Sequence, residues 1–285
     1  MKKNNVIIII LLFILLLTTF IIKYNNKKEM FDNKNAIVCL TRGYVNIDDY
    51  SKLIERNISI NKHFNKEYDI IIFNEGNIPI DHQEYIQNKT PYIKLIFITI
   101  PFYNNTEKNE ICLPNILSNM FSLGYKNMCY FWSIDFLEYL KNYEYIIRID
   151  EDCIINKIDK NIINNYKNHN IMFSSAYFQG ADSTKVTIGM EKLFDDYLKN
   201  NNLIKKNELK CPYTNFMIIN IPYFKNNKHV QNILQEIKNS NCIFSNRWGD
   251  LPIWGYILSY LINDQYYIED KNISYIHGSH GKHLN

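Results

Sequence analysis

The sequence is short of net charge, of glycine and proline, and of glycine-rich motifs. Its 32 basic and 29 acidic residues leave a formal net charge of only +3, without the basic excess typical of nucleic-acid-binding proteins. Nine glycines and seven prolines in 285 residues are too few for an all-β protein built from many tight turns. No glycine-rich phosphate loop occurs, so neither a Rossmann nor a P-loop site is predicted. We therefore expect no nucleic-acid partner.

The composition is that of an ordered globular protein. Hydrophobic residues make up 46% of the chain and charged residues 21%, and the length suits one large domain or two small ones. No internal repeat is present. The six cysteines lack the paired spacings of a zinc site. They lie at positions 39, 112, 129, 153, 211 and 242. In a lumenal domain they allow one or two disulfides, whose pairing the sequence leaves open.

One long apolar segment lies at the N-terminus. From Val6 to Ile22 only Thr18 and Thr19 interrupt the apolar run, and a helix of this length spans roughly 25 Å, enough for a thin bilayer. A cleaved signal peptide is the alternative, but the segment is followed by Lys23 and further polar residues rather than by small residues at a cleavage site. We predict a tail at 1–5, a transmembrane signal-anchor at 6–22 and a short stem at 23–35. Lysines flank both ends, so orientation stays open.

Beyond the stem, strand-like and helix-like segments alternate. Strands are expected at 36–40, 68–73, 92–100 and 143–149, and helices at 47–64 and 127–140. This rhythm predicts an α/β domain with a mostly parallel sheet, whose ligands bind beyond the carboxyl ends of the strands. In the first predicted helix the candidate buried residues are Ile47, Leu53, Ile54, Ile58 and Ile60.

An acidic cluster follows the strand at 143–149. If the extended conformation continues, Asp150 and Asp152 project to the same side. Carboxylate pairs of this kind bind Mg²⁺ or Mn²⁺ together with substrate phosphates, and such a metal neutralises a diphosphate leaving group. The alternative is a solvated acidic turn. The position of the acidic cluster at the end of a strand favours the interpretation as a metal site.

Two further clusters carry functional side chains. Arg247, Trp248 and Asp250 surround a glycine before an apolar segment; indole faces bind sugars, and the charged groups bind hydroxyls or phosphates. A helix N-terminus with Asp250 as N-cap and Pro252 in the first turn explains the same residues, and both interpretations can hold. Near the C-terminus, His277 lies close to two other histidines, which allows a metal or phosphate role.

Taken together, these segments resemble the yeast-type Golgi α-1,2-mannosyltransferases, glycosyltransferase family 15. The first two strands, with Thr41-Arg42 and Asn74 at their ends, are similar to those of the family. The other matching segments, in order, are Tyr125-Lys126-Asn127-Met128-Cys129-Tyr130-Phe131, Tyr145-Ile146-Ile147-Arg148-Ile149-Asp150, Asn215-Phe216, Arg247-Trp248-Gly249-Asp250 with Pro252, and Ser274-Tyr275-Ile276-His277.

The resemblance implies a GT-A-type nucleotide-sugar-binding fold and a type II membrane protein, with residues 36–285 forming a catalytic domain in the Golgi or ER lumen (in a host membrane if the protein is viral). It implies Mn²⁺ as cofactor, GDP-mannose as donor, a mannoside or glycoprotein as acceptor, and transfer with retention. The residues to which it assigns roles fall into three groups. The metal ligands are Asp150 and His277, with Asp152 adding an oxygen; the catalytic candidates are Tyr125 and Asp250; the donor- and acceptor-binding candidates are Arg42, Arg148, Asn215, Arg247 and Trp248.

The sequence also departs from the family pattern. Met217 follows Asn215-Phe216, where the family has a glutamate that is a candidate nucleophile. A front-face mechanism, in which the leaving diphosphate deprotonates the acceptor, needs no such carboxylate; otherwise Asp250 or Tyr125 must act on the acceptor. Two alternatives stay open: a degenerate protein that binds nucleotide or glycan without transfer, and an unrelated membrane α/β enzyme such as a metal-dependent phosphohydrolase.

Overall fold

The computed structural model describes residues 34–65, 67–104, 119–205, 208–278 and 282–284. Contacts separate residues 1–33 from a compact unit formed by 34–285. The predicted tail, the anchor at 6–22 and nearly all of the stem therefore lie outside the described residues. Within the described residues, no helix combines the length and apolarity needed to cross a bilayer.

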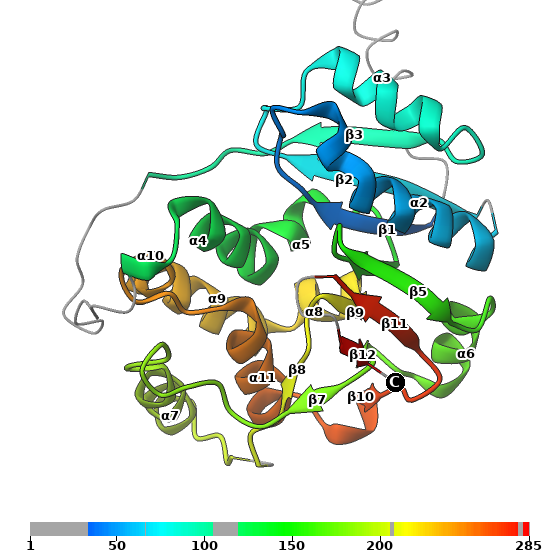
Figure 1. Ribbon diagram of the computed structural model, residues 1–285. Helices are drawn as coiled ribbons and strands as arrows, with labels where there is room; N and C mark the ends of the chain where they lie inside the picture. The colour runs from blue at the N-terminus through cyan, green and yellow to red at the C-terminus, as the bar shows by residue number, and fades with distance from the viewer. Residues whose placement is uncertain (1–33, 66, 105–118, 206–207, 279–281, 285) are drawn as a thin grey trace, which may run out of the picture. The chain divides into compact units, whose positions relative to one another are not determined.

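A seven-stranded sheet forms the centre of the domain (Figure 1), in the order β10-β6-β9-β4-β1-β2-β3. All neighbouring pairs are parallel except the two that involve β9. Its strands are β1 (Asn35–Leu40), β2 (Tyr68–Asn74), β3 (Leu95–Thr99), β4 (Tyr145–Ile149), β6 (Phe173–Ser175), β9 (Phe216–Asn220) and β10 (Tyr267–Glu269). The prediction of an α/β domain with a mostly parallel sheet is confirmed.

Two smaller sheets lie beside the central one. The first has the order β12-β11-β5 and the second pairs β7 with β8. Their strands are β5 (Cys153–Lys157), β7 (Phe178–Gln179), β8 (Cys211–Pro212), β11 (Ser274–His277) and β12 (Lys282–Leu284). Three residues separate β4 from β5, and β5 pairs antiparallel with β11, so the turn between β4 and β5 lies beside the end of β11.

Helices connect the strands and cover the sheet. They are α2 (Ser51–His63), α3 (Ile80–Lys89), α4 (Leu123–Tyr130), α5 (Phe136–Tyr139), α6 (Ile162–His169), α7 (Met190–Asn200), α8 (Ile221–Asn226), α9 (Lys228–Ser240), α10 (Cys242–Asn246) and α11 (Asp250–Leu261). Three short helical segments complete them: η1 (Ile47–Tyr50), η3 (Phe131–Asp135) and η4 (Asp264–Tyr266). Segment η3 is π-helical and joins α4 to α5, so the helix predicted at 127–140 is continuous but locally widened.

Both faces of the central strands are buried. On β4, Ile147 and Ile149 belong to the core cluster that includes Leu53 of α2, and Arg148 between them projects to the opposite face. On that face its guanidinium lies 4.4 Å from the centre of the Trp132 ring. A strand buried on both sides is a continuous apolar run, which is why the sequence predicted β1, β2 and β4. Strands β6, β9 and β10 were not among the predicted strands.

The first predicted helix is confirmed, but its buried face is partly different. Leu53 and Ile60 are buried as expected, whereas Ile58 is 54% exposed. Arg56 is fully buried instead, and its Nε–H donates to the carbonyl of Ile149 at 2.8 Å. Helix α2 turns Arg56 toward the end of β4, and Ile58, two residues later, therefore faces solvent.

Candidate functional site

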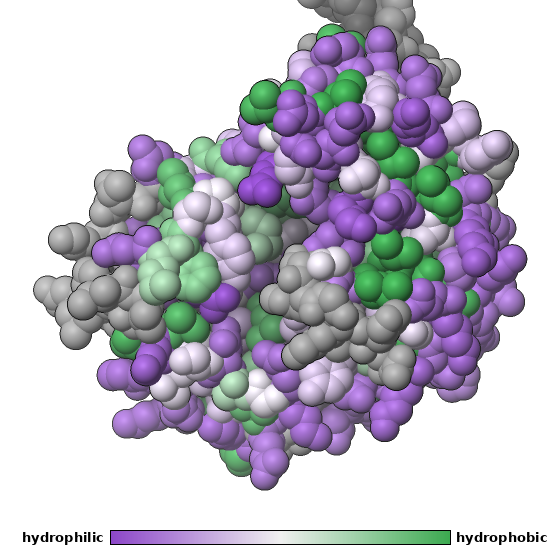
Figure 2. Space-filling view, viewed as in Figure 1, coloured by the Kyte–Doolittle hydropathy of each residue, from purple (hydrophilic) through white to green (hydrophobic). Residues whose placement is uncertain are grey.

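A pocket of about 580 Å³ opens at the carboxyl ends of β1 and β4. Figure 2 shows a face on which hydrophilic residues predominate and which is hollowed near its middle. The pocket brings together eight of the ten predicted site residues: Arg42, Tyr125, Arg148, Asp150, Asp152, Asn215, Asp250 and His277. Strand ends at one edge of a parallel sheet are where α/β proteins bind ligands.

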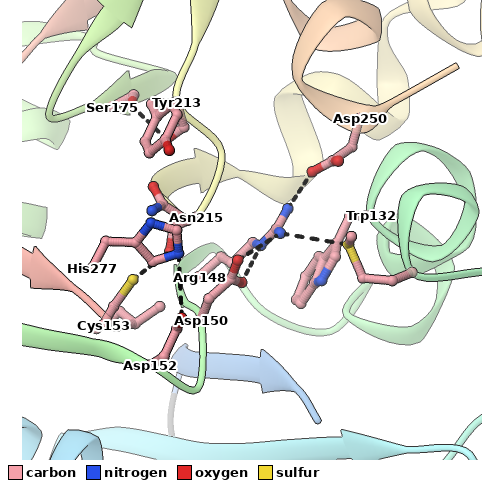
Figure 3. A network of polar contacts seen from close by, with 12 residues as sticks. Trp132, Arg148, Asp150, Asp152, Cys153, Ser175, Tyr213, Asn215, Asp250 and His277 are labelled. Carbon is pink, nitrogen blue, oxygen red and sulfur yellow. Dashed lines mark hydrogen bonds and ion pairs between the residues drawn. The ribbon is translucent and has the colours of Figure 1, made fainter. Parts of the chain in front are cut away.

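Arg148 lies at the centre of the site and joins two carboxylates (Figure 3). Its Nε–H and Nη2–H donate to Asp150 at 2.8 and 3.1 Å, and its Nη1–H donates to Asp250 at 2.5 Å. The guanidinium is only 2% exposed. Burial lowers the pKa of Arg148, but the two aspartates raise it by more, so the arginine remains charged. Arg148 therefore fixes Asp150 and Asp250.

The carboxylates of Asp150 and Asp152 have different partners. Residues 151 and 152 form a turn, so the extended conformation assumed from the sequence does not continue. Asp150 is held by Arg148, whereas Asp152 Oδ1 lies 3.4 Å from His277 Nε2. Asp152, His277 and Cys153 place their ligand atoms within 4.8 Å of one another. The turn thus separates the predicted ligands: Asp152 and His277 belong to this group and Asp150 does not.

The residues at the end of β1 are positioned by Glu151, which was not among the predicted site residues. Glu151 accepts hydrogen bonds from the hydroxyls of Thr41 and Tyr44, the latter at 2.6 Å. Burial raises the pKa of Glu151, and these hydrogen bonds oppose the shift. Arg42 lies over the Tyr44 ring, 5.2 Å from its centre. The middle carboxylate of the acidic cluster therefore ties the Arg42 loop to the β4–β5 turn.

Tyr125 is held by Arg247 rather than lying free in the pocket. Arg247 donates to the Tyr125 oxygen at 2.7 Å and to Asp182 at 3.1 Å. Its backbone has φ of 63°, the left-handed region that non-glycine residues rarely adopt. Burial raises the pKa of Tyr125 above its usual value of 10. Burial therefore favours the protonated form of the phenol, whose oxygen accepts from Arg247.

Trp248 and Asp250 lie on either side of Gly249, and only Asp250 reaches the pocket. Trp248 is fully buried, and its Nε1–H donates to the carbonyl of Ile188 at 2.9 Å. The indole face expected to bind a sugar is therefore closed to a ligand in this structure. Helix α11 begins at Asp250 with Gly249 as its N-cap, one residue earlier than the predicted cap. Asp250 is 7% exposed along its side chain.

The end of β9 supplies an amide to the site. Asn215 lines the pocket, accepts the hydroxyl of Tyr275 at 2.6 Å through Oδ1, and accepts the Asp150 backbone N–H at 2.9 Å through its carbonyl. Met217, two residues on, is fully buried and lies opposite Arg148 across the β4–β9 ladder. The position at which the resemblance implies a carboxylate nucleophile is thus apolar and sealed.

The donor set of the site suits a divalent cation. Asp152 offers carboxylate oxygens and His277 an imidazole nitrogen, and both are ligands for Mn²⁺ or Zn²⁺. The pKa of His277 is lowered by burial but raised more by its hydrogen bond to Asp152 and by the nearby carboxylates, so the net shift is upward.

Three solved structures share this fold. Core-mannan synthase A (CmsA/Ktr4) from Aspergillus fumigatus, in an Mn/GDP form, matches with a TM-score of 0.72 and 18% identity over 86% of this chain and 74% of that one. The mannosyltransferase Ktr4p from S. cerevisiae matches at 0.72 and 16% identity, over 86% of this chain and 70% of that one. The chain has the fold of these mannosyltransferases. Ktr4p in complex with GDP matches at 0.70 and 16% identity, over 86% and 71% of the two chains.

The resemblance inferred from the sequence motifs is therefore confirmed at the level of the fold. No protein-family model and no curated protein matches the sequence. The similarity thus rests on the structure.

Proposed function

We propose that this chain is a metal-dependent retaining glycosyltransferase. It transfers a sugar, mannose from GDP-mannose, to a mannoside or glycoprotein acceptor through an α-1,2 linkage. The observation that carries the proposal is the pocket at the ends of β1 and β4, in which a metal-ligating pair, Asp152 and His277, lies beside the Arg148 network. Mn/GDP is the state of the matching core-mannan synthase structure.

The metal would be held by Asp152 and His277, and it would neutralise the charge that develops on the departing diphosphate. Asp150, locked by two hydrogen bonds from Arg148, adds a fixed negative charge beside this pair. Arg42, at the end of β1, binds the nucleotide. Its loop is held in place by Glu151 through Thr41 and Tyr44.

Asp250 and Tyr125 act on the acceptor. The Tyr125 phenol, protonated and oriented by Arg247, donates a hydrogen bond, and the Asp250 carboxylate, held by Arg148, accepts one from the acceptor hydroxyl. Because Met217 cannot form a covalent intermediate, the new bond forms on the face that the diphosphate leaves. The acceptor oxygen bonds to the anomeric carbon, the carbon–phosphate oxygen bond breaks, and the acceptor proton passes to the leaving phosphate.

The membrane position is part of the same proposal: residues 6–22 anchor the chain, and the domain lies in the Golgi or ER lumen. Cys242 is disulfide-bonded, which favours an oxidising compartment. Four other cysteines, at positions 39, 129, 153 and 211, are free and buried.

The test measures nucleoside diphosphate release by the full-length chain from a panel of nucleotide sugars, with Mn²⁺ or with EDTA, and with or without a mannoside. The proposal predicts release from GDP-mannose that requires metal and increases with the mannoside. Release from another donor would keep the reaction and replace mannose, and release that does not depend on acceptor would indicate a phosphohydrolase. No release from a folded protein that binds GDP would instead support the degenerate, non-catalytic alternative that Met217 suggests.

A further inference from the structure

Cys153 lies beside His277 as a result of strand pairing. Strands β5 and β11 are antiparallel, and these two residues are direct partners in their register. Side chains directly opposite each other in an antiparallel pair lie on the same face, with Cβ atoms about 4.5–5.5 Å apart. The ladder that brings His277 to the pocket therefore also brings a thiol to it, and Asp152 precedes that thiol in the chain (Figure 3).

The three side chains have the dimensions of a metal site. The Asp152 oxygen, the Cys153 sulfur and a His277 nitrogen all lie within 4.8 Å of one another. Zinc bonds of about 2.0–2.3 Å in tetrahedral geometry place ligand atoms about 3.6 Å apart, so a shift of about 1 Å would close the cluster on one ion. The thiol donates a weak hydrogen bond, at 3.7 Å, to the carbonyl of Asn215.

Gly278 keeps the cluster compact. Its N–H donates to the Asp152 carbonyl at 2.8 Å, and a Cβ at this position would lie 3.2 Å from both the Cβ and the carbonyl oxygen of Asp152. A larger residue would therefore have to displace the Asp152 turn by a few tenths of an ångström. The glycine after His277 allows this close approach without such a shift.

We propose that Cys153 is a third protein ligand of the metal, and that the site prefers a borderline-soft ion such as Zn²⁺ or Co²⁺ to Mg²⁺. Coordination breaks the S–H bond, forms a metal–sulfur bond and releases one proton to solvent. Thiolate ligands select ions of this class, whereas Mg²⁺ is bound by oxygen. Asp150 stays outside the set because Arg148 holds its carboxylate.

Three protein ligands with a fourth position open to substrate is the arrangement of catalytic zinc sites. Here Asp152 and His277 line the pocket, whereas Cys153 is fully buried behind them. The open position therefore faces the pocket. This inference deepens the proposed function, because a diphosphate oxygen of the donor would take that position, but the metal site itself needs no nucleotide.

The test is a Co²⁺ titration of the purified, metal-free full-length chain, followed by near-ultraviolet absorption. A cobalt–thiolate bond gives an intense charge-transfer band that oxygen and nitrogen ligands do not give. We expect this band in the wild type and in Cys211→Ser, and its loss in Cys153→Ser with Co²⁺ bound at least about tenfold more weakly. Cys211 is a suitable control because it is also free and fully buried, but lies outside the cluster.

Two results would overturn the inference: Co²⁺ binding to the wild type without a charge-transfer band, or a band that persists in Cys153→Ser. The first needs no variant, so it stands even if Cys153→Ser fails to fold. Neither result involves turnover. A charge-transfer band without sugar transfer would support Cys153 as a metal ligand and reject the proposed function. Metal-dependent transfer without a band would support the proposed function and reject Cys153 as a ligand.

Discussion

Replacing Arg148 should destabilise the protein far more than an ordinary salt bridge would suggest. In Arg148→Met, the carboxylates of Asp150 and Asp250, 25% and 7% exposed, lose the one positive charge that contacts both of them. Removing one partner from a buried ion pair costs about 3–5 kcal/mol, because the remaining charge stays in a poorly solvated place. Methionine retains part of the packing against Trp132, so most of the loss should come from charge.

The assay is urea unfolding of the metal-free chain followed by circular dichroism. The matched control is Lys192→Met, whose pair with Asp196 has a similar distance of 2.5 Å but side chains that are 76% and 56% exposed; it should cost less than about 1 kcal/mol. Adding Asp150→Asn and Asp250→Asn to Arg148→Met should restore much of the stability, since amides need no counter-charge. Equal losses in Arg148→Met and the control, or no recovery in the triple variant, would refute the reasoning.

Three further predictions concern the pocket. The raised pKa of His277 means that Mn²⁺ affinity, measured by calorimetry, should fall by a further factor of about ten per pH unit below that pKa, and this change should begin at a higher pH than for a free imidazole. Without metal, the charged imidazole adds stability below pH ~6.5, and that stability is lost as pH rises through the raised pKa. Asp250→Asn should lower kcat about 10²-fold in the transfer assay, because a neutral amide positions the acceptor hydroxyl less well than the carboxylate does. GDP affinity should change little, since the amide still accepts from Arg148, and an unchanged kcat would remove Asp250 from acceptor positioning. Trp248→Phe should lower the free energy of unfolding by about 1–3 kcal/mol and leave the acceptor KM unchanged, because the indole is fully buried. A raised KM with normal stability would instead show that the indole binds the sugar.

Strands β1, β2 and β4 could be predicted from the sequence because their burial on both faces makes them continuous apolar runs. Strand β9 is equally buried but has only five residues, and it was not predicted. The position of the pocket followed as well, since parallel strands end at one edge of the sheet. The strand at 92–100 was predicted too long: β3 covers only Leu95–Thr99. Nothing local in the sequence distinguishes its extended flanks from the strand itself.

The side-chain contacts of the site could not be predicted, because they join residues that are distant in sequence. Arg148 and Asp250 are 102 positions apart, and Arg247 meets Tyr125 across 122 positions. Cys153 is likewise far from His277 in the sequence, and only the register of β5 and β11 places the two residues side by side. A local signal did exist for the separation of Asp150 from Asp152, since an acidic turn was the alternative interpretation of that cluster.

The sequence motif at 247–250 also did not reveal which of its side chains are buried and which reach the pocket. Arg247-Trp248-Gly249-Asp250 suggested one ligand surface, yet the structure buries the indole, engages the arginine with Tyr125 and Asp182, and presents only Asp250 to the pocket. Adjacent side chains at a helix start diverge, so one motif can serve both the core and the site.

The most direct test of the account measures GDP binding to the full-length chain by calorimetry, with and without Mn²⁺, in the wild type, in His277→Ala and in His229→Ala. His229 is a suitable control because its imidazole contacts Tyr197, outside the pocket. The account predicts that metal strengthens GDP binding in the wild type and in His229→Ala, and that His277→Ala loses this dependence. Metal-dependent GDP binding that survives in His277→Ala would contradict the assignment of the pocket as a metal-assisted nucleotide-sugar site.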